Sequence, residues 1–311
     1  MKTLERFIGR KIFFFGDSIT ADGRFFNYLR AFCVAKGIDI AFYNKGIAGY
    51  RADLLPIVLN EELSGEIPDF AVLSYGVNDL GVWLYDGRKT LTAEIIAERE
   101  NRMKNYFSAT ERNVFALREK GITPIVASPF CVNDGIEEKA GIVTAVDNNE
   151  KDVIDNGFYT RKTFRSINEG LNEMRVGLET LAKKLNAEFW DLFAYTNEYA
   201  CGECFIKDGL HYSQEGNFLI ANAVFGSMCG ASIERLPTSA GLISLYEKEA
   251  DERAYFFEKY NEAYFDTGRI LSDWELKSRL HEKSELFSDN DRYRRCLNYL
   301  SDKKDNRGDR K

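Results

Sequence analysis

The segment KIFFFGDSIT (residues 11–20) decides the fold of this chain. Its first half, Lys11–Phe15, is a short run of large apolar side chains, which is typical of a strand buried on both faces of a parallel sheet. Its second half places Ser18 on a strand-to-helix turn, near the N-terminus of the following helix. Unpaired N–H groups and the helix dipole favour developing negative charge there. Taken alone, Ser18 could equally be an ordinary N-cap or turn serine.

The same alternation continues along the chain. Four further short runs, each rich in Val, Ile, Phe or Tyr, are predicted to be buried strands: Ile38–Tyr43, Phe70–Tyr75, Pro124–Ala127 and Glu188–Leu192. Helical spacing of apolar residues lies between them: Phe25 to Phe32, Ile95 to Leu117 (one long helix or two, ending at Gly121) and Ile167 to Leu185. This order predicts an α/β fold with a parallel sheet, helices on both faces and ligands at the carboxyl ends of the strands.

Composition excludes several classes of protein. The chain has 311 residues, 44% of them apolar, and its 42 basic and 49 acidic residues give a net charge of −7. This argues against wholesale disorder, and against nucleic acid or an anionic membrane as the main partner. The most apolar stretch, Phe218–Ser232, is shorter than the roughly 20 residues that a bilayer requires. The apolar run near the N-terminus is too short for a signal peptide, so we expect a cytoplasmic protein.

Histidine is scarce, which makes its position informative. The chain has two histidines, His211 and His281. His211 ends the motif Asp208-Gly209-Leu210-His211, and imidazole is the most frequent general base near neutral pH. Asp208 could fold back to the ring, fix its tautomer and stabilise the imidazolium. The alternative is a histidine that only packs against, or caps, the helix after Ser213.

Two further segments follow predicted strands. Gly76-Val77-Asn78-Asp79 offers a side-chain amide that could stabilise an oxyanion. Asn44-Lys45-Gly46-Ile47-Ala48-Gly49 offers glycines, which let the backbone approach a ligand and present its N–H. We interpret Asp17 and Asp79 as residues that orient these loops by hydrogen bonds. Each segment, taken individually, could be ordinary turn chemistry.

The blocks GDSIT, NKGIAG, YGVND and DGLHYS are far more specific in combination than any of them is alone. In order and spacing, over about residues 8–230, the sequence resembles the SGNH hydrolases, also called the GDSL esterase/lipase family. The resemblance implies a three-layer α/β/α, flavodoxin-like fold with a central parallel sheet of about five strands. It also implies a serine esterase that needs no metal and no organic cofactor.

The resemblance assigns roles to individual residues. Ser18 would be the nucleophile, His211 the base and Asp208 the residue that orients His211. The Ser18 N–H, the Gly49 N–H and the Asn78 side chain would form the oxyanion hole. Gly49 is preferred because it ends the I-x-G pattern of that block, although Gly46 stays open. Asp191, at the end of the last predicted strand, is another possible partner for His211.

The expected substrate is a small-molecule ester with a short acyl group, for example an acetyl ester of a carbohydrate. An acyl transferase would use the same residues, and a non-catalytic ligand-binding module could occupy the same fold. Dinucleotide binding is disfavoured because the GxGxxG spacing is absent.

The six cysteines are irregularly spaced and fit free thiols. Cys201-Gly202-Glu203-Cys204 could be redox-active, or half of a zinc site that lacks its second half.

Two regions exceed the plan of the family. Residues 131–164 are long for a connection and could be a lid, a binding loop or plain surface packing. We place one domain at residues 1–234. Residues 235–311 would then be a helical C-terminal extension with a mobile charged tail, which packs on the core or forms a homo-oligomer contact. His281 lies in this extension and is expected to be a surface or packing residue.

Overall fold

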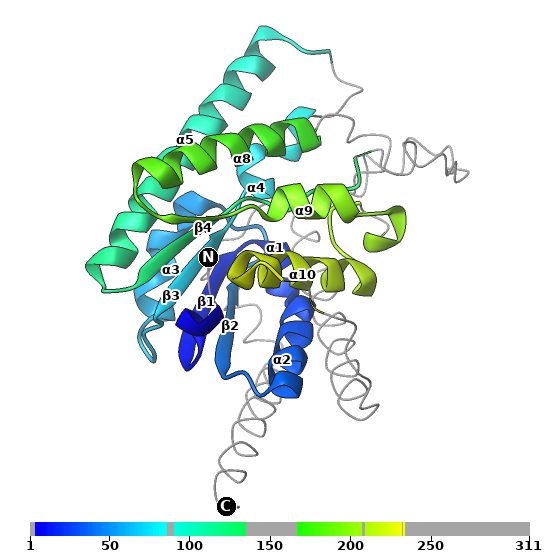
Figure 1. The fold of residues 1–311 in the computed structure, drawn as a ribbon. Coiled ribbons are helices and arrows are strands. Elements are labelled where there is room, and N and C mark those ends of the chain that lie inside the picture. Colours follow the sequence, from blue (N-terminus) through cyan, green and yellow to red (C-terminus); the bar gives the residue numbers. More distant parts are fainter. Residues whose placement is uncertain (1–3, 86–89, 135–166, 207–208, 232, 234–311) are drawn as a thin grey trace, which may run out of the picture. The chain divides into compact units, whose positions relative to one another are not determined.

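A parallel β-sheet forms the centre of the fold. The computed structural model describes residues 4–85, 90–134, 167–206, 209–231 and 233 (Figure 1). Within them five parallel strands pair in the order β2-β1-β3-β4-β5. Their bounds are β1 (Arg10–Gly16), β2 (Ile40–Gly46), β3 (Phe70–Ser74), β4 (Thr123–Ala127) and β5 (Glu188–Trp190). The five predicted strands are confirmed, with ends that coincide or differ by at most three residues.

Helices connect the strands and cover both faces of the sheet. They are α1 (Ser18–Asp22), α2 (Arg24–Lys36), α3 (Leu55–Glu62), α4 (Val77–Leu80), α5 (Ala93–Glu119), α8 (Ile167–Lys184), α9 (Leu192–Tyr199) and α10 (Gln214–Cys229). The short 3₁₀ turns are η1 (Leu4–Phe7), η2 (Ala52–Leu54), η3 (Val82–Tyr85) and η4 (Gly202–Cys204). Helix α10 packs against α2 and α9, whereas α5 packs against α3 and α8 (Figure 1). The chain therefore has the expected three-layer α/β/α fold.

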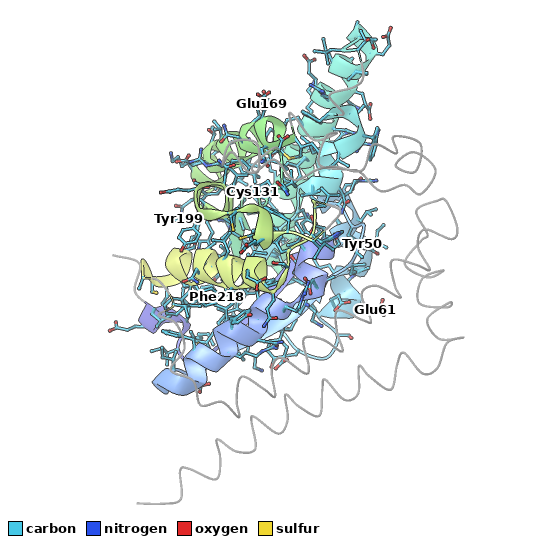
Figure 2. All side chains as sticks on the ribbon, turned by 90° about the vertical axis from the view of Figure 1, so that its right-hand side faces the viewer. Tyr50, Glu61, Cys131, Glu169, Tyr199 and Phe218 are labelled. Atoms are coloured by element: carbon cyan, nitrogen blue, oxygen red, sulfur yellow. The ribbon has the colours of Figure 1, made fainter. Side chains whose placement is uncertain are left out.

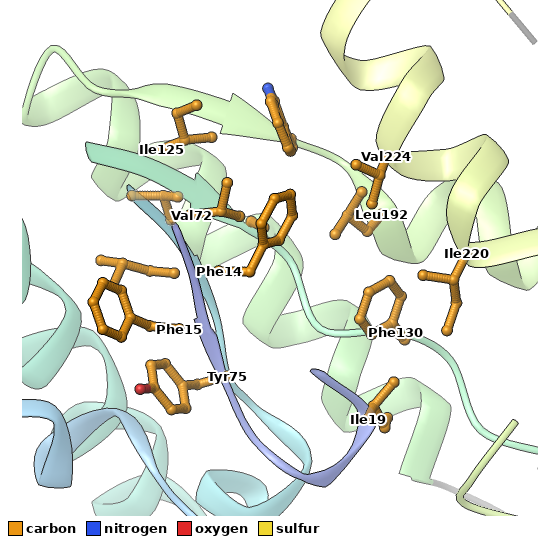
Figure 3. Packing of buried hydrophobic residues seen from close by; sticks show 14 of the residues in the cluster. Phe14, Phe15, Ile19, Val72, Tyr75, Ile125, Phe130, Leu192, Ile220 and Val224 are labelled. Carbon is orange, nitrogen blue, oxygen red and sulfur yellow. The ribbon is translucent and has the colours of Figure 1, made fainter. Parts of the chain in front are cut away.

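The core is built around β1. Its four consecutive apolar residues, Ile12 to Phe15, are each at most 1% exposed, because both faces of a central parallel strand are covered. Phe14 points toward α2, where its ring centroid lies 5.0 Å from that of Phe26. Phe15 points to the opposite face, on the side of Tyr75 (Figure 3). The two faces of one strand thus hold both helical layers.

The strand order fixes where a site can form. The chain leaves β1 for β2 on one side and returns to β3 on the other, so the connections diverge between β1 and β3. A crevice forms at such a switch point, outside the carboxyl ends of the strands. Gly16 ends β1 between Gly46 of β2 and Ser74 of β3. The segments that follow these residues are the ones that the sequence predicts to be functional.

Several details were not predicted. The region from 93 to 119 is a single helix, α5, which ends before Gly121 in the left-handed conformation. Helices α1, α3, α4 and α9 are short and were not foreseen. Most of the 131–164 connection, the whole extension 235–311 and His281 lie outside the described residues. Among the helices that are described, none has the length and apolarity needed to cross a membrane.

Candidate active site

Ser18 lies where the sequence places it, directly after β1 at the first position of α1. Asp17 is the N-cap of this helix, and its carboxylate accepts a hydrogen bond from the Ile19 N–H at 3.0 Å. A carboxylate at the N-cap satisfies one of the unpaired donors of the first turn. Asp17 therefore holds the turn that presents Ser18, as predicted from the sequence.

The segment that bears His211 meets Ser18 directly. His211 Nε2 lies 2.8 Å from Ser18 Oγ, although 193 positions separate the two residues. This is hydrogen-bond distance, and it is within reach for proton transfer between a hydroxyl and an imidazole. Both side chains are half-buried. The structure thus brings together the two residues that the sequence predicts to be nucleophile and base.

A second set of polar contacts holds these distant segments in place. Arg24, at the start of α2, pairs with Asp22 at 2.7 Å and donates a hydrogen bond to the Tyr212 carbonyl at 2.8 Å. Asn217 of α10 accepts from the Phe25 N–H at 3.1 Å and donates to Asp22 at 3.1 Å. The residue next to His211 is therefore tied to the helix pair that follows Ser18.

Asp17 also sets the electrostatics beside this pair. Burial raises the pKa of its carboxyl to about 6, against the Ile19 hydrogen bond and the positive charge of His211, which lower it. A buried carboxylate is costly unless it is compensated, so a nearby imidazolium and a backbone donor favour its charged form. Asp17 consequently changes its protonation in the same pH range as an ordinary imidazole.

The two glycines at the end of β2 and just after it have different surroundings. The Gly46 N–H donates to Asn44 Oδ1 at 2.9 Å, and a Cβ at Gly46 would lie 2.3 Å from the Ala21 nitrogen. Gly46 thus serves close packing against α1. Gly49 occupies a turn closed by the Tyr50 N–H on the Ile47 carbonyl at 3.2 Å, with a φ of 77° that favours glycine. Among the described residues, the Gly49 N–H has no acceptor.

Asn78 contacts the residue that follows this turn. Asn78 lies in α4, just after β3, and its side-chain amide donates to the Tyr50 carbonyl at 3.1 Å. Tyr50 (Figure 2) thus links the turn at Gly49 to α4. An amide has two donor hydrogens, so this bond leaves one for a ligand. Asn78 and Gly49 are thereby held on neighbouring segments.

Two buried side chains fasten the same loop to the helices behind it. Asp79 Oδ1 accepts from the Ala52 N–H at 2.9 Å, and Asn113 of α5 donates to the Ala52 carbonyl at 2.8 Å. Asp79 is 5% exposed and Asn113 is 1% exposed. The prediction that Asp79 orients a loop by hydrogen bonding is confirmed. Asn113 was not foreseen, because nothing in the periodicity of α5 distinguishes a buried asparagine from a surface one.

Asp79 is the most perturbed carboxyl of this region. Burial, and to a smaller extent the nearby carboxyls of Asp17 and Asp53, raises its pKa to about 8, although the Ala52 hydrogen bond and Arg51 lower it. Its Oδ2 is buried and has no hydrogen-bond partner among the described residues. A neutral, protonated Asp79 therefore fits this position better than a carboxylate.

This burial predicts a pH-dependent stability. The folded chain holds the Asp79 proton up to about pH 8, whereas the unfolded chain releases it near the ordinary aspartate pKa of 3.8. Unfolding therefore releases a proton between these values, and the contribution of Asp79 to stability falls as the pH rises through this window. We expect Asp79→Asn, which keeps the acceptor for Ala52, to lose stability less steeply with pH than the wild type does.

The measurement is the free energy of unfolding in urea, taken at intervals from about pH 4 to pH 8. Asp39→Asn, at an exposed aspartate, serves as the control for removing one negative charge. Parallel stability curves for Asp79→Asn and the wild type across this range would contradict the assignment.

The remaining predicted site residues have different outcomes. Asp208 lies outside the described residues, so its predicted contact with His211 stays a prediction. Both oxygens of Asp191 are engaged: Oδ1 accepts from the Ala194 N–H at 3.0 Å, and Oδ2 accepts from Arg175 at 2.7 Å. Asp191 thus caps α9 and pairs with Arg175. The described residues contain no group of three or more His, Cys, Asp or Glu side chains suited to a metal ion.

Comparisons with solved structures agree with this fold. Among solved structures, an acetylxylan esterase from Geobacillus stearothermophilus matches with a TM-score of 0.51 and 19% identity, over 76% of this chain and 99% of that chain. A gut microbial diltiazem-metabolizing enzyme matches with a TM-score of 0.56 and 16% identity, over 71% of this chain and 47% of that chain. At these identities the likeness concerns the fold. No curated protein matches this chain.

The chain also matches a protein-family model. The model described as GDSL-like lipase/acylhydrolase matches residues 12–224, which is more than half of the chain and includes Ser18, Gly49, Asn78 and His211. By fold and by this match, the chain belongs to the GDSL-like lipase/acylhydrolase family of hydrolases.

Proposed function

We propose that this chain is a serine carboxylesterase that works through an acyl-enzyme on Ser18. The observation that carries the proposal is the 2.8 Å separation of Ser18 Oγ and His211 Nε2 at the switch point of the sheet. A serine hydroxyl is a weak nucleophile until a base takes its proton, and this contact supplies the base. Asp208 is proposed to orient His211, as the family resemblance implies.

The reaction would proceed in two acyl-transfer steps. His211 takes the Ser18 proton as Ser18 attacks the ester carbonyl, and the imidazolium then protonates the departing alcohol. Water, activated by the same imidazole, attacks the acyl-enzyme and releases the acid. The Ser18 N–H, the Gly49 N–H and the Asn78 amide would bind the oxyanion in both steps. Donors fixed in advance are effective because they need no reorganisation when charge develops.

The hydrogen bonds around the loop support that assignment. Asn78 bonds Tyr50, while Asp79 and Asn113 bond Ala52, so three side chains anchor the backbone that follows Gly49. Such anchoring keeps a backbone donor within a fraction of an ångström of its productive position. This favours a reactive site over a loosely organised surface loop.

A common acyl-enzyme predicts how products partition. Two acetate esters with different leaving alcohols would form the same acetyl-Ser18, so methanol added to the reaction should trap it in the same ratio to water for both. The measurement is the ratio of methyl acetate to acetate at one methanol concentration. Ratios that differ between the two esters would contradict a shared intermediate. A ratio strongly in favour of a sugar alcohol over water would identify an acyl transferase instead.

We propose further that the acyl group is short and the alcohol part polar, as in an acetylated carbohydrate. Arg102 of α5 donates to the Asp79 carbonyl at 3.2 Å, and its guanidinium lies 4.5 Å from the ring centroid of Trp83. Trp83 is 39% exposed, so an aromatic and a cationic group lie near the helix that bears Asn78. Aromatic surface beside polar groups suits a sugar. The fold neighbour described as an acetylxylan esterase is consistent with this substrate class.

The acyl preference is tested with p-nitrophenyl esters that differ only in acyl length. We expect kcat/KM for the acetate to exceed that for the octanoate by at least ~10-fold, or about 1.4 kcal/mol in transition-state binding. Acetate release from glucose pentaacetate, measured alongside, checks that a carbohydrate ester is accepted. A preference for octanoate would overturn the short-acyl assignment and leave the esterase assignment intact.

A further inference from the structure

A pair of cysteines lies beside the segment that bears His211. Cys201 follows α9, which ends at Tyr199 (Figure 2), and Cys204 ends η4. Their sulfur atoms are 3.5 Å apart, and the Cys204 N–H donates to the Cys201 carbonyl at 3.0 Å. Cys201 is exposed, whereas Cys204 is 6% exposed. The two sulfurs thus form a close dithiol with one accessible member and one sheltered member.

The backbone of Cys204 is held firmly on its other side. The Ser213 N–H donates to the Cys204 carbonyl at 2.9 Å, and the next residue, Phe205, pairs antiparallel with Tyr212. The Ile206 N–H donates to the His211 carbonyl at 3.0 Å. A Cβ at Gly216 would lie 2.0 Å from the Cys204 carbonyl oxygen, so α10 leaves this carbonyl no room to shift. Cys204 is therefore fixed to the segment next to His211.

We propose that Cys201 and Cys204 form a reversible dithiol–disulfide site, at which Cys201 reacts first with a small-molecule disulfide and Cys204 completes the bond. This inference is independent of the proposed esterase function. In the first step, the Cys201 thiolate attacks one sulfur of the oxidant, whose S–S bond breaks and whose other half leaves as a thiol after gaining a proton. In the second step, Cys204 loses its proton to solvent and attacks the Cys201 sulfur of the mixed disulfide, which releases the second thiol.

The balance of the two steps is a two-electron exchange. Two protein thiols are oxidised to one disulfide, and one small disulfide is reduced to two thiols. The order of attack follows from exposure. Burial, together with the neighbouring Cys201 thiol, raises the pKa of the Cys204 thiol to about 11, so Cys204 carries little thiolate near neutral pH. Once Cys201 bears the mixed disulfide, proximity lets Cys204 react.

The geometry also indicates which of the two cysteines moves when the disulfide forms. The sulfur atoms must close from 3.5 Å to a bond length of about 2.05 Å. Because Cys204 is held by Ser213 and α10, the exposed Cys201 makes most of this movement. The disulfide would then tie the end of α9 to the Phe205–Tyr212 pair without displacing the latter. We therefore expect oxidation to raise the unfolding temperature by several degrees.

The test uses the full chain in a Cys229→Ser/Cys296→Ser background, so that the partly buried Cys229 and the cysteine outside the described residues cannot react. The protein is treated with oxidised glutathione and analysed by intact mass and peptide mapping. The expected product is a Cys201–Cys204 cross-link that has lost two hydrogens and carries no adduct. Cys204→Ser should instead accumulate one glutathione on Cys201, whereas Cys201→Ser should remain unmodified. Cys33 and Cys131, both buried, serve as internal controls.

Thermal unfolding supplies the second readout. The oxidised protein should melt at a higher temperature than the reduced one, dithiothreitol should reverse the rise, and Cys201→Ser should show no change with oxidant. If Cys204→Ser does not fold, Cys204→Ala replaces it. Absence of the cross-link overturns the site, and so does equal labelling of Cys204 in Cys201→Ser. A cross-linked protein with an unchanged or lower melting temperature overturns the proposed fixed position of Cys204.

Discussion

Ser18→Ala is expected to lower kcat for ester hydrolysis by on the order of 10⁵ to 10⁶-fold while the chain stays folded. The loss is large because the Ser18 hydroxyl, which lies 2.8 Å from His211 Nε2, would form the covalent bond to the acyl group. The fold should survive because Ser18 is the first residue of α1, where Asp17 provides the cap, and alanine is a good helix former.

Two measurements check this prediction. Turnover of p-nitrophenyl acetate is compared for the wild type and Ser18→Ala, each shown to be folded by circular dichroism and thermal melting. A fluorophosphonate probe should label the wild type at Ser18 and leave Ser18→Ala unlabelled. Wild-type turnover in a clean preparation of the variant would end the nucleophile assignment. A wild-type protein with neither turnover nor labelling would favour the non-catalytic binding module.

The sheet could be predicted because each strand is a short, nearly continuous apolar run. Residues 12–15 are buried on both faces, so their pattern needs no knowledge of neighbours to be recognised. Helices α5 and α8 were predicted for the same reason, since their apolar residues repeat at helical spacing. Helix α1, with five residues, and α4, with four, are too short to produce such a repeat. Their existence depends on caps and on contacts with the strand ends.

The site was predictable only in part. Ser18 and His211 follow from the motifs, and the strand order explains why motifs that follow β1 and β3 lie close together. The residues that hold them in register are contacts between distant segments: Arg24 with Tyr212, and Asn113 with Ala52. No local pattern marks these pairs, because an arginine or asparagine in a helix is normally exposed. Only the three-dimensional arrangement identifies them.

The glycine segment shows a different limit of prediction from the sequence. The sequence favours Gly49 over Gly46 on a motif alone, whereas in the structure Asn44 accepts from the Gly46 N–H and α1 packs against the Gly46 Cα. A side chain two residues away thus decides which backbone donor stays available. This choice could not be derived from residue types alone, since either glycine could present its N–H.

His211→Ala is expected to lower kcat by nearly as much as Ser18→Ala, on the order of 10⁵-fold, because nucleophile and base act as one unit. The double variant Ser18→Ala/His211→Ala should therefore be no less active than either single variant. Added imidazole should restore part of the activity to His211→Ala and none to the double variant. Losses that multiply in the double variant would show that the two residues act independently, against the proton transfer inferred from their 2.8 Å contact.

The pH profile separates His211 from its buried neighbour. In the wild type, kcat/KM should fall at low pH as the imidazole, with a reference pKa of about 6.5, becomes protonated and can no longer accept the Ser18 proton. Because Asp17 has a pKa raised to about 6, its titration overlaps this limb. Asp17→Asn keeps the acceptor for the Ile19 N–H and removes that titration. If the acidic limb persists in Asp17→Asn, the protonation that lowers kcat/KM is that of the His211 imidazole. If the limb disappears, Asp17 controls the activity, and the identification of His211 as the base fails.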